Sequence, residues 1–223
     1  MKAFISYSTR EKSHGGRIKA IFDELGIESF LAHEDLNVSE EWERRILSEV
    51  KSCQIFVPLL SSMFKESDWC SQETGIIVNR RGVLVIPLSI DGVMPYGFIS
   101  HIQGHSLTGD DVDKEVILNA IGKKWPTKII DLLMPTMERV FSFREAESVM
   151  NPFRPYFAYF SPEQANRFAR LSVANGQIWS AHLCRREYMP EFLAHNEDKI
   201  ESNTLAALKY QIDNQSWYRD ENA

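Results

Sequence analysis

Short apolar runs alternate with stretches of helical spacing over roughly the first 124 residues, and this alternation constrains the fold more than any other feature of the chain. The runs that favour strands lie at 3–7, 27–31, 55–60 and 83–88, with a weaker one at 105–107. Apolar residues recur at helical spacing in most of the segments between them. Such alternation predicts an α/β fold with a doubly wound parallel sheet of five strands.

A sheet of this kind binds its ligands at the carboxyl ends of the strands. The segments of interest are therefore 6–8, the polar loop 32–39 and 61–73, which follow the first three strands. No glycine-rich phosphate-binding loop of either common pattern is present. A phosphate-receiver domain is also disfavoured. It needs acidic residues at the ends of the first and third strands, where this chain has Ser6-Tyr7 and Leu60-Ser61.

Residues 125–223 show no strand alternation and hold more than half of the aromatic residues of the chain. A capping serine at Ser161 predicts the start of a helix, and Pro190 predicts an interruption. We therefore expect two domains, one over 1–124 and a small all-α domain over 125–223. A cluster of aromatic residues in the second domain predicts a core, a seam between domains or an exposed partner surface. These residues are Phe153, Tyr156, Phe157, Tyr159 and Phe160.

Composition excludes several classes of function. A net charge of −6 disfavours a nucleic-acid partner, and no apolar run approaches the ~20 residues of a membrane-spanning helix. The three cysteines are widely spaced without a CxxC pattern, which indicates a reduced, cytoplasmic protein. His101 and His105 lack a third ligand nearby, so we expect no metal site.

The segment 67–73, with the sequence Ser-Asp-Trp-Cys-Ser-Gln-Glu, carries the most information about chemistry. Trp69 and Glu73 are four residues apart and would share one face of a helix that begins beyond the third strand. An aromatic ring beside a carboxylate suits a substrate with a base and a sugar. Cys70 is either a reactive thiol at a helix start or a small buried apolar residue.

Three separated motifs are similar to those of Toll/interleukin-1 receptor (TIR) domains and occur in the same order. They are Phe-Ile-Ser-Tyr-Ser at 4–8, Trp42 with Ile46 on the second helix, and the segment 61–73. The resemblance covers about residues 1–124 and implies a flavodoxin-like sheet. Many bacterial and plant members of the family cleave the nicotinamide–ribose bond of NAD, and Glu73 matches their catalytic glutamate.

In an enzyme that cleaves NAD, other residues near the ends of the strands would have supporting roles. Tyr7 and Trp69 would form stacking walls for the bases, and Ser6 and Ser8 would hydrogen-bond the substrate. NAD would be a substrate, so no cofactor is expected. The loop at 32–39 matches the BB loop of the family, through which protomers associate. Its candidate assembly residues are His33, Glu34, Asp35 and Leu36.

Two positions depart from the pattern of the family. Ser39 stands where a glycine often precedes the tryptophan of the second helix, and an acidic residue after the first strand is loosely represented by Glu11. Neither departure affects Glu73. The expected activity is therefore that of an NAD glycohydrolase or ADP-ribosyl cyclase, which gives ADP-ribose or a cyclic signal in bacterial antiviral immunity.

Two other functions remain open at this stage. A non-catalytic TIR scaffold would act by TIR–TIR association alone, and a nucleoside or nucleotide N-glycosidase would use the same carboxylate on another substrate. A cyclic product would require a downstream effector that senses the nucleotide. The helical domain at 125–223 would regulate the domain at 1–124 or promote its assembly.

Overall fold

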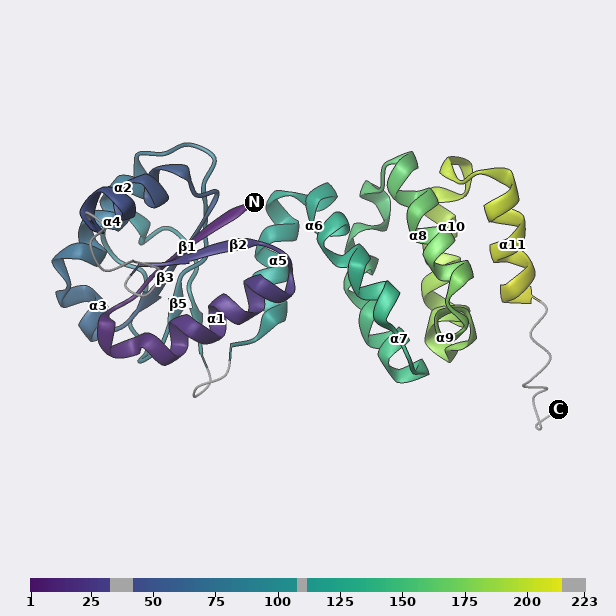
Figure 1. Cartoon of the computed structure of the whole chain (residues 1–223), viewed down its shortest axis with the longest axis horizontal. Coiled ribbons are helices and arrows are strands. Elements are labelled where there is room, and N and C mark those ends of the chain that lie inside the picture. Colours follow the sequence, from purple (N-terminus) through teal and green to yellow (C-terminus); the bar gives the residue numbers. More distant parts are fainter. Residues whose placement is uncertain (33–41, 108–111, 214–223) are drawn as a thin grey trace. The chain divides into compact units, whose positions relative to one another are not determined.

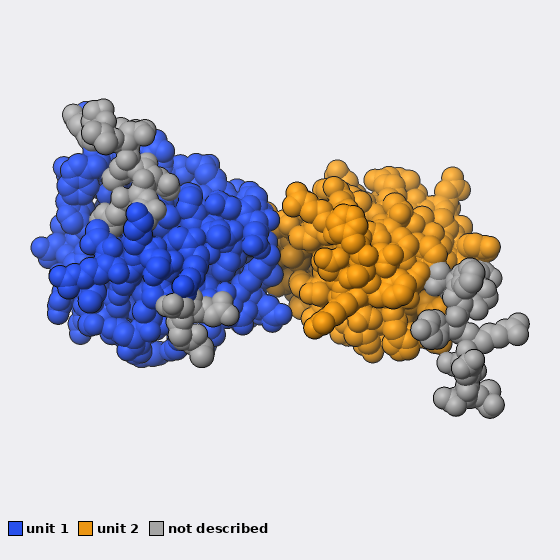
Figure 2. All heavy atoms as spheres, turned by 60° about the horizontal axis from the view of Figure 1, so that its bottom comes forward, with its two compact units in different colours: residues 1–124 blue, residues 125–223 orange. Residues whose placement is uncertain are grey.

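The computed structural model describes residues 1–32, 42–107 and 112–213 (Figure 1). The chain divides into two compact units, residues 1–124 and residues 125–223 (Figure 2). The loop residues His33, Glu34, Asp35 and Leu36 lie outside the described residues, as do Ser39 and the rest of 33–41.

The first unit is built on one parallel sheet. Its strands are β1 (Lys2–Ser6), β2 (Glu28–Leu31), β3 (Ile55–Leu60), β4 (Leu84–Val85), β5 (Leu88–Ser89) and β6 (His105–Ser106). The order across the sheet is β2-β1-β3-β5-β6, and β4 also pairs with β3. All these pairs are parallel, which confirms the predicted flavodoxin-like architecture.

The run predicted as a single fourth strand is divided into β4 and β5. The register is the same on both sides of the break, because Ile55 pairs with Leu84 and Leu59 pairs with Leu88. This register sets Pro58 opposite Pro87. Since proline has no backbone N–H, Pro58 cannot continue the ladder of hydrogen bonds that Phe56 makes with Ile86. Pro58 therefore interrupts the pairing without shifting it.

Helices cover the sheet. In the first unit these are α1 (Lys12–Glu24), α2 (Trp42–Ser52), α3 (Ser62–Glu66), α4 (Asp68–Val78) and α5 (Lys114–Lys124), with short 3₁₀ turns η1 (Thr9–Glu11) and η2 (Gly97–Ile99). Phe4, Phe30 and Phe56 stack side by side across three strands. Residues of α2 and α4 pack on this row of rings, whereas α1 lies on the other face, where Gly15 meets Leu31.

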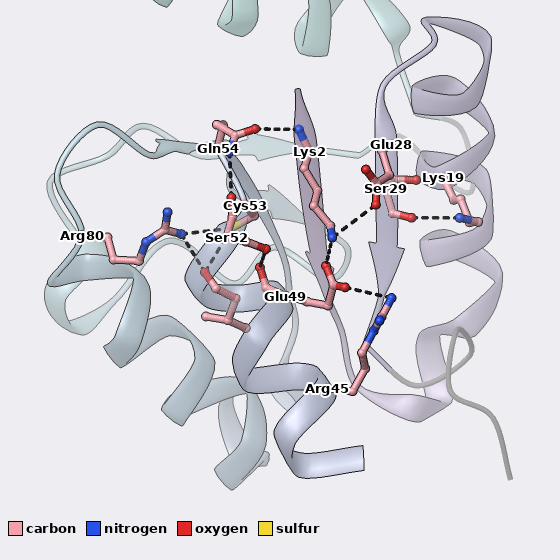
Figure 3. A network of polar contacts seen from close by, with 11 residues as sticks. Lys2, Lys19, Glu28, Ser29, Arg45, Glu49, Ser52, Cys53, Gln54 and Arg80 are labelled. Carbon is pink, nitrogen blue, oxygen red and sulfur yellow. Dashed lines mark hydrogen bonds and ion pairs between the residues drawn. The ribbon is translucent and has the colours of Figure 1, made fainter. Parts of the chain in front are cut away.

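Ion pairs fix the amino end of β1 (Figure 3). The Lys2 ammonium pairs with the buried Glu49 carboxylate of α2 and lies 3.2 Å from Glu28 of β2. Arg45 reaches the other oxygen of Glu49 at 2.9 Å. A buried carboxylate is tolerated when it is paired in this way. At this end of the sheet, charged residues therefore hold structural elements together.

Arg80, just beyond α4, closes the end of α2 (Figure 3). Its guanidinium donates to the carbonyl oxygen of Val50 at 2.6 Å and to Cys53 Sγ at 3.4 Å. The last carbonyl groups of a helix lack partners within the helix, and a cation there satisfies one of them. This contact ties the ends of α2 and α4 together.

The second unit is helical. Its α-helices are α6 (Pro126–Leu133), α7 (Phe143–Met150), α8 (Pro162–Ala174), α9 (Gly176–Ser180), α10 (Met189–Asn196) and α11 (Ser202–Asp213). Shorter 3₁₀ or π segments are η3 (Met134–Arg139), η4 (Asn151–Tyr159), η5 (Cys184–Tyr188) and η6 (Glu197–Lys199). Ser161 caps α8 in a complete capping box with Gln164. Pro190 lies in the first turn of α10, where η5 gives way to an α-helix, so the chain changes helix type there instead of leaving the helix.

Most of the aromatic cluster in the second unit forms its core. The rings of Phe153, Phe157 and Phe160 pack against Phe168 of α8, with centroids 5.1 to 5.9 Å apart. Phe192 of α10 completes the group at 4.4 Å from Phe168. Tyr159 lies outside this core and is exposed. The cluster is therefore chiefly a core, the first of the three possibilities that the sequence leaves open.

The described residues contain neither a membrane-spanning helix nor a cluster of metal ligands. None of the described helices is both long and apolar enough to cross a membrane. In the same parts of the chain, no group of three or more His, Cys, Asp or Glu side chains is arranged to hold a metal ion.

Candidate active site

Glu73 lies on the buried face of α4, between Cys70 and Ile77. The helix begins at Asp68, and the side chain of Ser67 caps it by accepting a hydrogen bond from Cys70 N. This start places Glu73 one turn and a half along the helix, next to the carboxyl end of β1. There the hydroxyl of Ser6, the last residue of β1, donates a hydrogen bond to Glu73 Oε2.

The environment of Glu73 favours its neutral form. The residue is only 2% exposed, and burial raises the pKa of its carboxyl to about 7, although the hydrogen bond from Ser6 acts in the opposite direction. The second oxygen, Oε1, is buried and has no hydrogen-bond partner among the described residues. A buried acceptor without a donor is costly. This oxygen is therefore suited to accept a hydrogen bond from a ligand.

A second buried carboxyl group belongs to Glu11, at the end of η1. Burial raises its pKa, while a hydrogen bond from the side chain of Ser61 lowers it. Glu11 Oε2 is likewise buried without a partner in the part of the chain that is described. The sequence singled out Glu11 only as a loose match to a family position. The structure gives it the same kind of environment as Glu73.

Cys70 lies close to both carboxyl groups. Burial, together with the nearby charges of Glu73 and Glu11, raises the pKa of its thiol to about 11. The hydroxyls of Ser67 and Ser6 hydrogen-bond the sulfur and act in the opposite direction. Cys70 is therefore a neutral, buried thiol at physiological pH, which agrees with the apolar role and not with a reactive nucleophile.

A serine lies at the carboxyl end of each of three adjacent strands at this edge of the sheet. Ser6 ends β1, Ser61 follows β3 and Ser89 ends β5, and all three are buried. Ser61 also caps α3, since its oxygen accepts a hydrogen bond from Phe64 N at 2.9 Å. The Ser89 hydroxyl is buried without a hydrogen-bond partner among the described residues. Ser89 was not predicted as a site residue, although its position at the end of an apolar run was a usable signal.

Tyr7 is buried between β1 and α1. Its ring is 1% exposed and packs so closely on α1 that a Cβ atom at Gly15 would come within 3.4 Å of it. Tyr7 is therefore part of the core in this structure, and stacking of a base on its ring stays a prediction. Ser8 is half-buried, and its carbonyl oxygen accepts from Glu11 N at 2.7 Å.

Trp69 is half-buried and packs against a second tryptophan. Its ring centroid lies 4.3 Å from that of Trp42 on α2, with the rings inclined by 62°. Trp42 is 43% exposed. The aromatic surface predicted from Trp69 alone is therefore a pair of rings that joins α2 to α4, a contact that sequence spacing did not reveal.

The fold and this edge define a class of protein, a flavodoxin-like α/β domain with two buried carboxyl groups where its ligand-binding edge is expected. A family model described as the TIR domain matches residues 3–118, which is more than half of the chain. The chain therefore belongs to the TIR family. A search of curated proteins found no match.

Proposed function

We propose that the first unit cleaves the nicotinamide–ribose bond of NAD, with Glu73 as the catalytic residue. The observation that carries this proposal is the carboxyl group of Glu73, which is buried, held at one oxygen by Ser6 and unpartnered at the other. The TIR family includes members with this activity, and the matched region contains Glu73.

The chemistry of NAD fits a site with one essential carboxylate. The nicotinamide ring carries a positive charge and leaves as a neutral molecule when its bond to the ribose breaks, so no acid has to protonate it. The positive charge moves to the ribose as an oxocarbenium centre, which the negative charge of Glu73 stabilises. Water then adds to the ribose carbon and loses a proton, which gives ADP-ribose. An internal nucleophile of the bound substrate gives a cyclic product instead.

The raised pKa of Glu73 is compatible with this role. With a pKa of about 7, the carboxyl group of Glu73 in the free protein titrates near neutral pH. A cationic ring placed beside the carboxyl group favours its ionised form. Substrate binding and ionisation of Glu73 therefore support each other, and Oε1 is available to accept a hydrogen bond from a ribose hydroxyl.

Other residues have supporting roles in this proposal. Ser6 orients Glu73, Ser8 lies at the same edge, and Trp69 with Trp42 offers an aromatic wall.

The proposal also includes assembly and regulation. Protomers associate through the loop at 32–39, and the second unit regulates the first unit or promotes its assembly. In a cell, this activity would serve antiviral defence by consuming NAD or by producing a nucleotide signal for an effector.

An assay of nicotinamide release tests the proposal against its two competitors. The full chain is incubated at high concentration with NAD and, separately, with a panel of nucleosides and nucleotides, and the products are identified by mass spectrometry. The proposal predicts nicotinamide and ADP-ribose, or its cyclic form, from NAD. Release of free base from nucleosides alone would indicate an N-glycosidase. Self-association without any turnover would indicate a scaffold.

A further inference from the structure

A concave site separate from the Glu73 cluster lies along the outer edge of β4. This pocket has a volume of about 520 Å³ and lies between the chain at 84–87, the start of β6 and α5. None of the residues that line it belongs to the group around Glu73 and Glu11. Its size falls within the range typical of small-molecule sites.

The backbone of Val85 is open toward this pocket. Leu84 N donates to Gln54 O at 2.8 Å and Ile86 N donates to Phe56 O at 2.9 Å, so both point toward β3. Because backbone groups of successive residues in a strand point to opposite sides, the N–H and C=O of Val85 point away from β3. The next strand, β6, pairs only with Leu88 and Ser89 of β5. On the side away from β3, the backbone of Val85 therefore has no strand partner in the described structure.

The open edge is too short for an added peptide strand. β4 has two residues, and the next residue on the outer side, Pro87, has no N–H to donate. On the other side, Val83 O already accepts a hydrogen bond from Lys124 Nζ at 2.9 Å. What remains is one donor and one acceptor on the same residue, which matches the edge of a flat heterocycle better than a polypeptide.

The charge of the pocket favours an anion. The chain carries a net charge of −6, yet none of the pocket residues is acidic. Exposed Lys123 and His105 lie at its rim with Asn119. The rest of the lining is largely apolar, with the side chains of Leu84, Val85, Ile86, Pro87, Val116 and Ala120.

We propose that this pocket binds a purine mononucleotide. A purine such as adenine presents a donor and an acceptor side by side, which complements the C=O and N–H of Val85. The apolar lining buries the faces of the base, and Lys123 pairs with the phosphate group. The site makes the first unit responsive to a nucleotide whose binding does not require Glu73.

Titration calorimetry of the full chain with adenosine monophosphate tests the proposal. Lys123→Glu reverses the charge at the rim, and Ala120→Phe fills the pocket. Lys51→Glu is the matched control, because Lys51 is also an exposed lysine in the last turn of a helix. Glu73→Gln separates this site from the proposed active site.

The expected result is saturable binding that Lys123→Glu weakens at least tenfold and Ala120→Phe removes, with no change in Lys51→Glu or Glu73→Gln. Since Lys123 is exposed, its replacement leaves the fold intact even if Ala120→Phe does not. The absence of saturation below about 10 mM would overturn the proposal. Binding that Glu73→Gln removes and Lys123→Glu leaves unchanged would also overturn it, since the nucleotide would then occupy the Glu73 site.

Discussion

The hydroxyl of Ser6 donates a hydrogen bond to Oε2 of Glu73, a residue 67 positions further along the chain. This bond joins the end of β1 to the buried face of α4 and leaves the other oxygen of Glu73 without a partner in the described structure. It orients the carboxylate and opposes the effect of burial on its pKa. The function that we propose depends on this arrangement.

Removal of the Ser6 hydroxyl is expected to change the pH dependence of activity. Because Glu73 acts as a carboxylate, kcat/KM for NAD in the wild-type protein rises with pH through about 7. In Ser6→Ala the carboxyl loses the hydrogen bond that lowers its pKa, so the rise moves to higher pH. Rates of nicotinamide release from pH 5 to 9 measure this shift. An unchanged profile in Ser6→Ala would show that the bond does not tune Glu73.

The same carboxyl group is expected to destabilise the folded protein above neutral pH. In the unfolded chain its pKa is near 4.5, whereas in the folded protein it is about 7. Between these values the folded state binds more protons, so its free energy of unfolding falls as pH rises. Glu73→Gln removes this dependence and stabilises the protein at pH 8, by up to about 3 kcal/mol. Urea unfolding of both proteins at pH 5 and pH 8 measures the difference. Parallel pH dependence in the two proteins would contradict the raised pKa.

The sequence of this protein indicates its local features more directly than its long-range contacts. The strands and the position of Glu73 were predictable because apolar runs and a helix start are local patterns. The split of the fourth strand was not, since it depends on Pro58 of β3 lying beside this run in a register that only the folded sheet defines. The burial of Tyr7 was not predictable for a similar reason, because nothing local shows that Gly15 lets α1 approach its ring.

The partners of the site residues are also long-range. Trp69 is evident in the sequence, but its contact with Trp42 requires α2 and α4 to lie side by side. The environment of Glu11 is not evident in the sequence either. Glu11 lies in the turn after β1, whereas Ser61, which hydrogen-bonds it, follows β3 and caps α3. Topology, rather than any motif, brings these side chains to one edge.

A chain that ends at Lys124 is expected to fold. The first unit contains every strand of the sheet among the described residues, and the phenylalanine core of the second unit is built from residues beyond 150. The shortened protein should unfold cooperatively and keep weak affinity for NAD, but lose regulation by the second unit. Circular dichroism and calorimetry with NAD check these properties. An insoluble product would show that the two units depend on a shared core.

Activity is expected to increase more than linearly with protein concentration, because we propose that protomers associate through the loop at 32–39. Leu36→Asp places a charge on an apolar residue of that loop and should remove the increase. The measurement is specific activity over a wide dilution series. Constant specific activity in the wild-type protein would mean that a single protomer contains the complete site.

The most direct test of the account compares nicotinamide release from NAD by the wild-type chain, Glu73→Gln and Glu66→Gln. The last is a matched control, because Glu66 is an exposed glutamate of α3 and undergoes the same chemical change. Circular dichroism establishes that all three proteins are folded. We predict that Glu73→Gln reduces turnover about 10²-fold or more, whereas Glu66→Gln retains it. Turnover retained by folded Glu73→Gln would contradict the assignment of this residue as catalytic.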